Sequence, residues 1–471
     1  MNLFSVLLAL APVSSAVFAE RELGSRPLFA ISLTCFAGMF VLPQRWPRES
    51  WRQSVARVAR RVATDRVFFV MAAFLVMAAI PLFNVGLCPG CDWRAIREGA
   101  NPLPPFRWLP FCVRPMEHEA VLSWFAPVFA TIMFVRNGLT RHGRRVLFEC
   151  LVWIACALAL YGFARQFAAS SGAKGAFSVF GYANMAGAYF AFCYALALGL
   201  WSRRMVQSAA FRAPDSAPRH PILAKHYPLA AVALTGFASF ATLCRAAMLF
   251  VIAFTFLFFV YAMLASLTGR HKVNRFAAMS SIMVLLALVV TVMTFSPPDV
   301  GRELATLNVR TVSDRASGKG QYHERVALAI FRDFPLFGVG GWGYRHFCTS
   351  YMTEKELKSL QSDGGANVHN DYLQFLCEHG IVGFGLLAAF FFLLVKSVVD
   401  RWREVYDSYR FVQKKMAPVS PIVVYAVSPP VLWTMVGVVA LLLQALGDCP
   451  FRSPAVLATE LAALAAVTGY F

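Results

Sequence analysis

Three side chains in the polar parts of this sequence have the chemistry to bind an anion and move a proton: His369, Arg325 and Arg245. Leu373 and Gly380 lie on one helical face just after His369, which predicts that His369 sits in the first turn of a helix. The positive end of a helix disfavours the imidazolium form, so such a histidine keeps a neutral nitrogen that accepts a proton near neutral pH. A structural or solvent-facing histidine is the alternative that spacing alone leaves open.

Arg245 separates two apolar segments, and no acidic residue lies within about twenty positions on either side of it. A guanidinium without a local partner at a bilayer edge is costly to bury. It must therefore reach lipid headgroups or meet an anion that another segment or a substrate brings. The sequence by itself favours neither outcome.

The composition shows what kind of protein must position these groups. Of 471 residues, 58% are hydrophobic and 15% are charged, whereas soluble domains carry about 25% charged residues. The mean hydropathy is +0.57. Residues 246–268 and 276–296 each exceed the roughly 20 apolar residues that cross a bilayer. We therefore predict an all-α, polytopic membrane protein with about twelve spans, at 2–19, 27–43, 67–85, 119–135, 146–163, 183–201, 227–243, 246–268, 276–296, 380–399, 421–446 and 453–471.

The net charge of +19 is concentrated in alternate gaps between these spans. Five gaps hold 25 of the 44 lysines and arginines: 44–66, 136–145, 202–226, 269–275 and 396–420. The positive-inside rule places these gaps, and both termini, in the cytoplasm. Basic loops beside spans need no nucleic acid to explain them, so we predict no nucleic-acid partner. The first span lacks a charged segment before it and is predicted to stay in the protein rather than to be cleaved.

One long polar segment lies on the opposite, exported side. It divides the chain into a first group of spans (1–296), an exported catalytic loop (297–379) and a second group of spans (380–471). Within the loop, the apolar spacing of residues 321–334 predicts a helix that contains Arg325 and ends before Pro335. The glycine-rich run that follows fits no dinucleotide-binding unit. It is either a backbone-amide site for phosphate or, as we favour, a tight turn that fixes the loop on the membrane part.

Cysteines fall into two groups. Cys88, Cys91 and Cys112 share one exported loop, where a structural disulfide with one thiol left over is favoured above a redox or zinc site. Cys348, Cys377 and Cys449 are also exported, without an evident pairing. The remaining group lies within spans and is expected to pack as small apolar residues, at Cys35, Cys150, Cys156 and Cys193.

Four blocks, in this order, resemble the signature of the O-antigen ligase and O-antigen polymerase superfamily. They are 180–187 (FGYANMAG), 245–247 (RAA), Arg325 with 333–340 (DFPLFGVG), and 369–374 (HNDYLQ) followed by Glu378, Gly380 and Gly383. Cys244 stands where the family has a serine, and the first block keeps Asn184 but lacks the second asparagine. The resemblance covers residues 176–390 and agrees with the predicted spans.

This resemblance implies transfer of a glycan from an undecaprenyl diphosphate carrier to an acceptor at the periplasmic face of the bacterial inner membrane. It implies that Arg245 and Arg325 hold the donor diphosphate and that His369 activates the acceptor hydroxyl. Asn370, Tyr372 and Asn184 would complete the substrate contacts, although Tyr372 also fits a packing role. Two forked arginines suit two phosphates, and a diphosphate is already a good leaving group, so neither a cofactor nor a metal is expected.

The signature leaves the acceptor open. We favour an O-antigen ligase, whose acceptor is the lipid A core. The alternatives are a polymerase of O-antigen or exopolysaccharide repeats, a protein O-glycosyltransferase, and a transporter of the lipid-linked sugar. Transport is disfavoured because only three acids, Glu119, Glu149 and Glu460, lie within the predicted spans and no internal repeat is found. The sugar, its linkage and the oligomeric state are not specified by the sequence.

Overall fold

The computed structural model describes residues 2–17, 26–43, 49–86, 106, 108–168, 177–210, 222–267, 319–363, 367–415 and 428–470. Across these ranges every regular element is a helix, and the only ladder contacts are two isolated bridges. The all-α class predicted from the sequence is confirmed. The ninth predicted span, at 276–296, lies outside the described residues.

Each of the other eleven predicted spans coincides with a helix. Six of the described helices are long and apolar enough to cross a membrane, and five apolar ones are shorter, so a membrane protein is supported but a count of twelve spans is not confirmed. The helices are α1 (Asn2–Val17), α2 (Arg26–Val41), α4 (Arg66–Ala79), α6 (Pro115–Asn137), α7 (Arg141–Ala168), α8 (Ala183–Ala210), α9 (Ile222–Ala241), α10 (Arg245–Leu267), α17 (Asp371–Lys415), α18 (Pro429–Gln444) and α19 (Pro454–Ala466).

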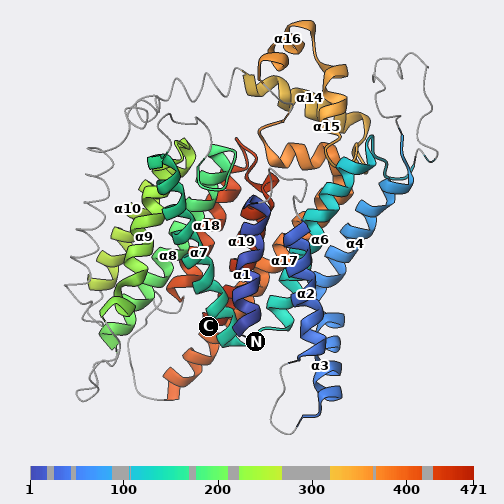
Figure 1. Cartoon of the computed structure of the whole chain (residues 1–471). Helices are drawn as coiled ribbons and strands as arrows, with labels where there is room; N and C mark the ends of the chain where they lie inside the picture. The colour runs from blue at the N-terminus through green and yellow to red at the C-terminus, as the bar shows by residue number, and fades with distance from the viewer. Residues whose placement is uncertain are drawn as a thin grey trace.

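These helices form one bundle with two distinct ends. The helices of residues 319–363 lie at one end of the bundle. Both termini and the short amphipathic helix α3 (Trp51–Thr64) lie toward the opposite end (Figure 1). The basic segments that the sequence assigns to one side meet at this end, since Arg61, Arg136 and Arg401 line a common cavity. Below, the two ends are called the loop end and the termini end.

The loop end carries a small helical module with its own apolar core. It consists of α14 (Lys319–Asp333), α15 (Tyr344–Phe347), a 3-10 turn (Cys348–Tyr351) and α16 (Glu354–Asp363). Val326, Ile330 and Phe347 are buried in this core together with Phe111 from the segment before α6. The helix predicted at 321–334 is confirmed, and the chain leaves it at Pro335 because proline cannot continue the hydrogen-bond ladder.

The module is attached to the bundle at a break in α17. Gly380 has φ 62° and ψ −173°, so the helix is interrupted there. The freed carbonyls of Cys377 and Glu378 accept from the amides of Val339 (3.1 Å) and Gly340 (2.9 Å). In return, the amides of residues 381 and 382 donate to the carbonyls of residues 335 (2.8 Å) and 336 (3.1 Å). Backbone groups freed by the break are thereby satisfied, as an apolar environment requires.

Two glycines permit this close approach. A Cβ on Gly338 would lie 2.4 Å from the Glu378 carbonyl carbon, and one on Gly380 would lie 2.3 Å from the Leu336 carbonyl. Both residues also have positive φ, which other residues rarely adopt. The amide of Gly341 donates to His118 Nδ1 at 2.8 Å. The glycine-rich run is therefore the predicted tight turn, and its amides are already used rather than left open for phosphate.

Cysteines in the described residues are all unpaired. Cys112 is buried, and its thiol donates to the carbonyl of Pro81 at 3.1 Å. Cys348, Cys377 and Cys449 are likewise buried thiols. Cys88 and Cys91 lie outside the described residues, so the predicted disulfide with one thiol left over stays a prediction.

Candidate functional site

His369 stands at the loop end, immediately before α17 rather than inside its first turn. The helix begins at Asp371, and the Oδ1 atom of Asn370 accepts from the Leu373 amide at 3.2 Å, as an N-cap residue does. His369 itself has φ 55°, a left-handed conformation that costs a non-glycine residue roughly 1–2 kcal/mol. The sequence prediction was wrong by these two positions because the Asn370 cap was not recognised.

The imidazole of His369 lies in a polar cluster. Its side chain is 46% exposed, and its Nδ1 atom lies 3.9 Å from Oδ1 of Asp448. On another side, the His369 ring lies 6.4 Å from the ring of His323, centroid to centroid. His323 is buried, and its Nδ1 atom is 2.7 Å from the Tyr344 hydroxyl. A half-exposed imidazole can accept a proton from a hydroxyl placed beside it.

Asp448, in the connection between α18 and α19, was not singled out from the sequence. It is nearly buried, and its Oδ1 atom accepts from the Cys449 amide at 2.8 Å. The signal that could have found it is an acid directly after an apolar span, at the end of the bundle expected to be exported.

His369, Asp448 and Cys449 together are the one possible metal-ligand group among the described residues, with ligand atoms within 4.8 Å of one another. Burial and the nearby Asp448 raise the pKa of the Cys449 thiol, which favours the protonated form over the thiolate that metals bind. This donor set therefore fits a metal poorly, and independence from metals remains a prediction.

Asn184 and Arg245 lie at neighbouring helix starts. The side-chain nitrogen of Gln444, at the end of α18, lies 3.4 Å from the Asn184 carbonyl and 4.0 Å from the Cys244 sulfur. A Cβ on Gly187 would lie 2.4 Å from the Cβ of Cys244, so this glycine lets the turn that precedes Arg245 pack onto α8. The side-chain Nδ2 of Asn184 donates to the Tyr182 hydroxyl at 3.1 Å.

This group shares an electrostatic environment with Asp448. Burial raises the pKa of the Cys244 thiol to about 11, and Asp448 contributes to the increase. Partial burial followed by the charge of Asp448 likewise raises the pKa of Tyr182. Asp448 therefore lies near His369, the start of α8 and the turn before Arg245. Arg245 is the first residue of α10 and is half-buried.

Arg325 lies on α14, next to residues that contact the His369 segment. Its neighbour Glu324 accepts from Asn370 Nδ2 at 3.4 Å. The Arg325 guanidinium, 52% exposed, donates instead to both carboxylate oxygens of Glu356, at 3.0 and 2.8 Å. To hold a phosphate, Arg325 must exchange this carboxylate for it.

A buried ion pair joins Arg452 to carboxylates at the start of α17. Arg452 donates to Glu378 Oε2 at 2.7 Å, and its Nε atom lies 3.9 Å from Asp371 Oδ1. Burial alone would lower the pKa of Arg452, but the Glu378 and Asp371 carboxylates outweigh it and raise this pKa. The guanidinium also lies over the Trp342 ring, 4.5 Å from its centroid. The charge of Glu378 is thereby balanced by Arg452.

An apolar groove of about 470 Å³ reaches the start of α17, two residues after His369. Asp371 and Tyr372 line one part of it, and the rest is formed by α17, α18 and α19, including Phe384, Leu387, Phe391, Val438, Leu442 and Leu461. The Tyr372 hydroxyl donates to the Leu442 carbonyl at 2.8 Å, so this predicted substrate contact is also a structural one. Such a groove is suited to an alkyl or prenyl chain.

The fold and the site together define a polytopic helical membrane protein with a polar acid–base cluster at the head of an apolar groove. Residues 230–388 match the family model described as O-Antigen ligase. The match confirms the resemblance to the O-antigen ligase family over the region that holds three of the four motif blocks. This family comprises glycosyltransferases of the ligase and polymerase type, whose substrates are lipid-linked glycans. No curated protein matches the chain.

Proposed function

We propose that the protein transfers a glycan from undecaprenyl diphosphate to the lipid A core, at the periplasmic face of the inner membrane. The observation that supports this most is the position of His369. It is half-exposed, 3.9 Å from Asp448, and two positions before Asp371, the first α17 residue that lines the apolar groove. A prenyl tail in that groove brings its diphosphate to the same end of the bundle as the imidazole.

The reaction follows from these positions. The acceptor hydroxyl attacks the anomeric carbon while the bond from that carbon to the diphosphate oxygen breaks, and the electron pair leaves with undecaprenyl diphosphate. The hydroxyl proton passes to His369, and Asp448 stabilises the resulting imidazolium. Displacement from the opposite side inverts the anomeric centre. Arg245 and Arg325 hold the departing phosphates, the latter after release from Glu356.

The proposal includes a division of labour along the chain. Residues 297–379 act as the catalytic loop, between the spans of residues 1–296 and those of 380–471. Asn370 and Asn184 position substrate near His369 and Arg245, respectively. Both termini face the cytoplasm, because the basic segments gather at the termini end and short basic loops remain on that side.

The test is transfer by the purified full-length chain, supplied with carrier-diphosphate glycan in the presence of EDTA. One reaction receives lipid A core as acceptor, and a parallel reaction receives a second carrier-linked repeat. Conjugate formation with the core alone supports a ligase, whereas extension of the repeat alone identifies a polymerase and refutes the ligase assignment. Loss of activity in EDTA, restored by a divalent metal, would contradict the metal-free mechanism.

A further inference from the structure

A second polar site lies at the termini end, across the bundle from His369. It is a cavity of about 460 Å³ where α3, α6, α7 and α17 approach one another. A neighbouring cavity of about 420 Å³ shares part of its wall. The charged residues around the first cavity are one carboxylate, Asp65, and five arginines: Arg61, Arg136, Arg141, Arg144 and Arg401.

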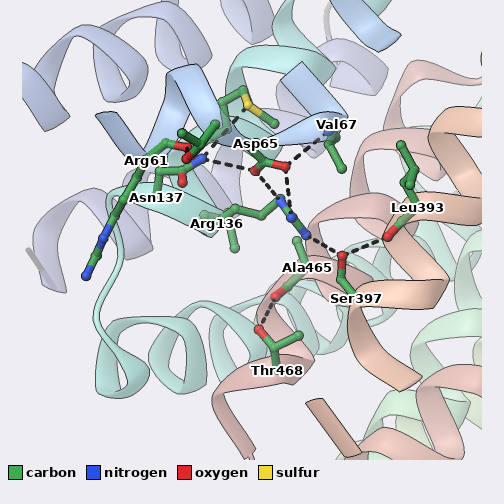
Figure 2. A network of polar contacts seen from close by, with 12 residues as sticks. Arg61, Asp65, Val67, Arg136, Asn137, Leu393, Ser397, Ala465 and Thr468 are labelled. Carbon is green, nitrogen blue, oxygen red and sulfur yellow. Dashed lines mark hydrogen bonds and ion pairs between the residues drawn. The ribbon is translucent and has the colours of Figure 1, made fainter. Parts of the chain in front are cut away.

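Asp65 is fully engaged by one of these arginines. Arg136 donates to both of its carboxylate oxygens, at 2.8 and 3.0 Å, and to the Ser397 hydroxyl at 3.0 Å (Figure 2). Asn137 adds a longer contact of 3.4 Å to the same carboxylate. The network ties α6 to α17 and to the junction before α4, and it leaves the charges of the other arginines unmatched by Asp65.

Arg144 is held in place without a counter-charge. It donates to the carbonyls of Val135 (3.0 Å) and Arg136 (2.5 Å) and to the Thr468 hydroxyl (2.8 Å). These acceptors satisfy its hydrogen bonds and close the end of α6, but none of them carries a full negative charge. The guanidinium is therefore a fixed positive charge at the wall of the cavity.

Arg61 and Arg141 bring two further positive charges to the rim. Both are exposed, and the Arg61 side chain extends away from the Asp65–Arg136 pair (Figure 2). Within the described ranges, neither they nor Arg144 lies within 4.0 Å of a carboxylate oxygen. Arg401 differs, since it pairs with Glu404 at 2.7 Å. Three guanidinium groups thus face one cavity without a carboxylate partner among the described residues.

We propose that this cavity binds a phosphate group, presented either by the headgroup of an anionic lipid or by a free phosphate. Guanidinium groups match the tetrahedral oxygens of phosphate with paired, charge-assisted hydrogen bonds. The positive-inside rule explains why basic residues lie on this side, but it does not require residues from four separate segments to line one cavity. A bound phosphate would offset part of the excess charge and join α3, α6 and α7. This inference is independent of the proposed function.

The test uses the full-length chain in neutral detergent and compares two double variants. Arg61→Gln with Arg141→Gln removes two positive charges from the rim. The control, Arg60→Gln with Arg403→Gln, removes two exposed charges that line neither cavity. Arg60 lies on α3, as Arg61 does, and Arg403 lies on α17. Native mass spectrometry measures binding of phosphatidylglycerol and phosphatidylcholine to each protein. A separate thermal-unfolding series compares sodium phosphate with sodium chloride at equal ionic strength.

We expect the unsubstituted chain and the control pair to bind phosphatidylglycerol more tightly than phosphatidylcholine. The rim pair should weaken phosphatidylglycerol binding about thirtyfold, because each basic residue near an anionic headgroup contributes roughly a factor of five. A different outcome is that phosphatidylglycerol is not preferred, while sodium phosphate raises the Tm and the rim pair abolishes this rise. In that case the site exists and its ligand is a free phosphate. An equal loss in the control pair, or no response to either ligand, would overturn the proposal.

Discussion

The two ends of the bundle balance charge in different ways. At the loop end, Arg452 meets Glu378 and Asp371, and Arg325 meets Glu356, while His369 is left half-exposed beside Asp448. At the termini end, five arginines surround a cavity with one carboxylate. The first arrangement fixes the geometry around one titratable group, which suits a reaction. The second leaves positive charge unmatched, which suits binding.

The sharpest way to test this contrast is to remove one histidine from each end. His369→Ala should lower the rate of glycan transfer by about 10²- to 10⁴-fold, because it removes the proposed general base. His142→Ala, at an exposed position near the start of α7, should leave the rate unchanged. Initial rates with the carrier-linked donor are the measurement. Full turnover by the His369 variant would mean that another group accepts the proton.

The buried pair can be compared with its counterpart at the other end. Arg452→Gln leaves Glu378 buried without its partner and should reduce the free energy of unfolding by about 3–5 kcal/mol. Arg136→Gln, whose side chain is 22% exposed, should cost less than half of that. Unfolding by denaturant in detergent provides both values. Equal costs would show that the loop end does not depend on this pair.

Asp448→Asn tests whether the carboxylate acts through His369. We expect a decrease in kcat of about tenfold with little change in KM, because opposite unit charges near 4 Å interact by at least about 1 kcal/mol close to solvent. In a chain that already carries His369→Ala, the same substitution should have no further effect on kcat. An additive loss in the double variant would indicate a separate role for Asp448.

Arg325 and Glu356 offer opposite changes to one contact. Arg325→Lys should raise the donor KM several-fold, since an ammonium does not reproduce the forked hydrogen bonds of guanidinium. Glu356→Gln should leave KM the same or lower it, because it weakens the competitor of the donor phosphate. Steady-state kinetics with varied donor separate the two. A higher KM in both variants would mean that the pair positions α14 rather than exchanging with substrate.

The smallest expected effect is a dependence on pH within the module. Burial would raise the pKa of Glu356, but hydrogen bonds from Thr353 and Arg325 and the Arg325 charge hold this pKa below its ordinary 4.5. A carboxyl group whose pKa is lower in the folded state stabilises that state at pH values above its ordinary pKa. This stabilisation is lost as the pH falls through the folded-state pKa. The protection of α16 amides against hydrogen exchange, corrected for the intrinsic exchange rate at each pH, should therefore fall below about pH 4.5 in the unsubstituted chain and change less with pH in Glu356→Gln.

The sequence predicted the helices and their polarity better than it predicted the site. Apolar runs report burial directly, so the described spans and α14 were found, as was the turn at the glycine-rich run. The contacts of Asp448 and Arg452 join residues about 80 positions apart, for which a single sequence carries no local signal. The His369 error was smaller and avoidable, because an asparagine followed by an aspartate is a common helix start.

The interruption of α17 at Gly380 bears on how this part of the protein can move. Four backbone hydrogen bonds join the two segments there, and each would be expensive to expose within lipid. Detachment of the module from α17 is therefore disfavoured, and because the bonds lie on both sides of Gly380 they also resist rotation about the break. The long helix and the helices above it should consequently travel together, so that any motion that opens the groove to a lipid tail would carry His369 along with it.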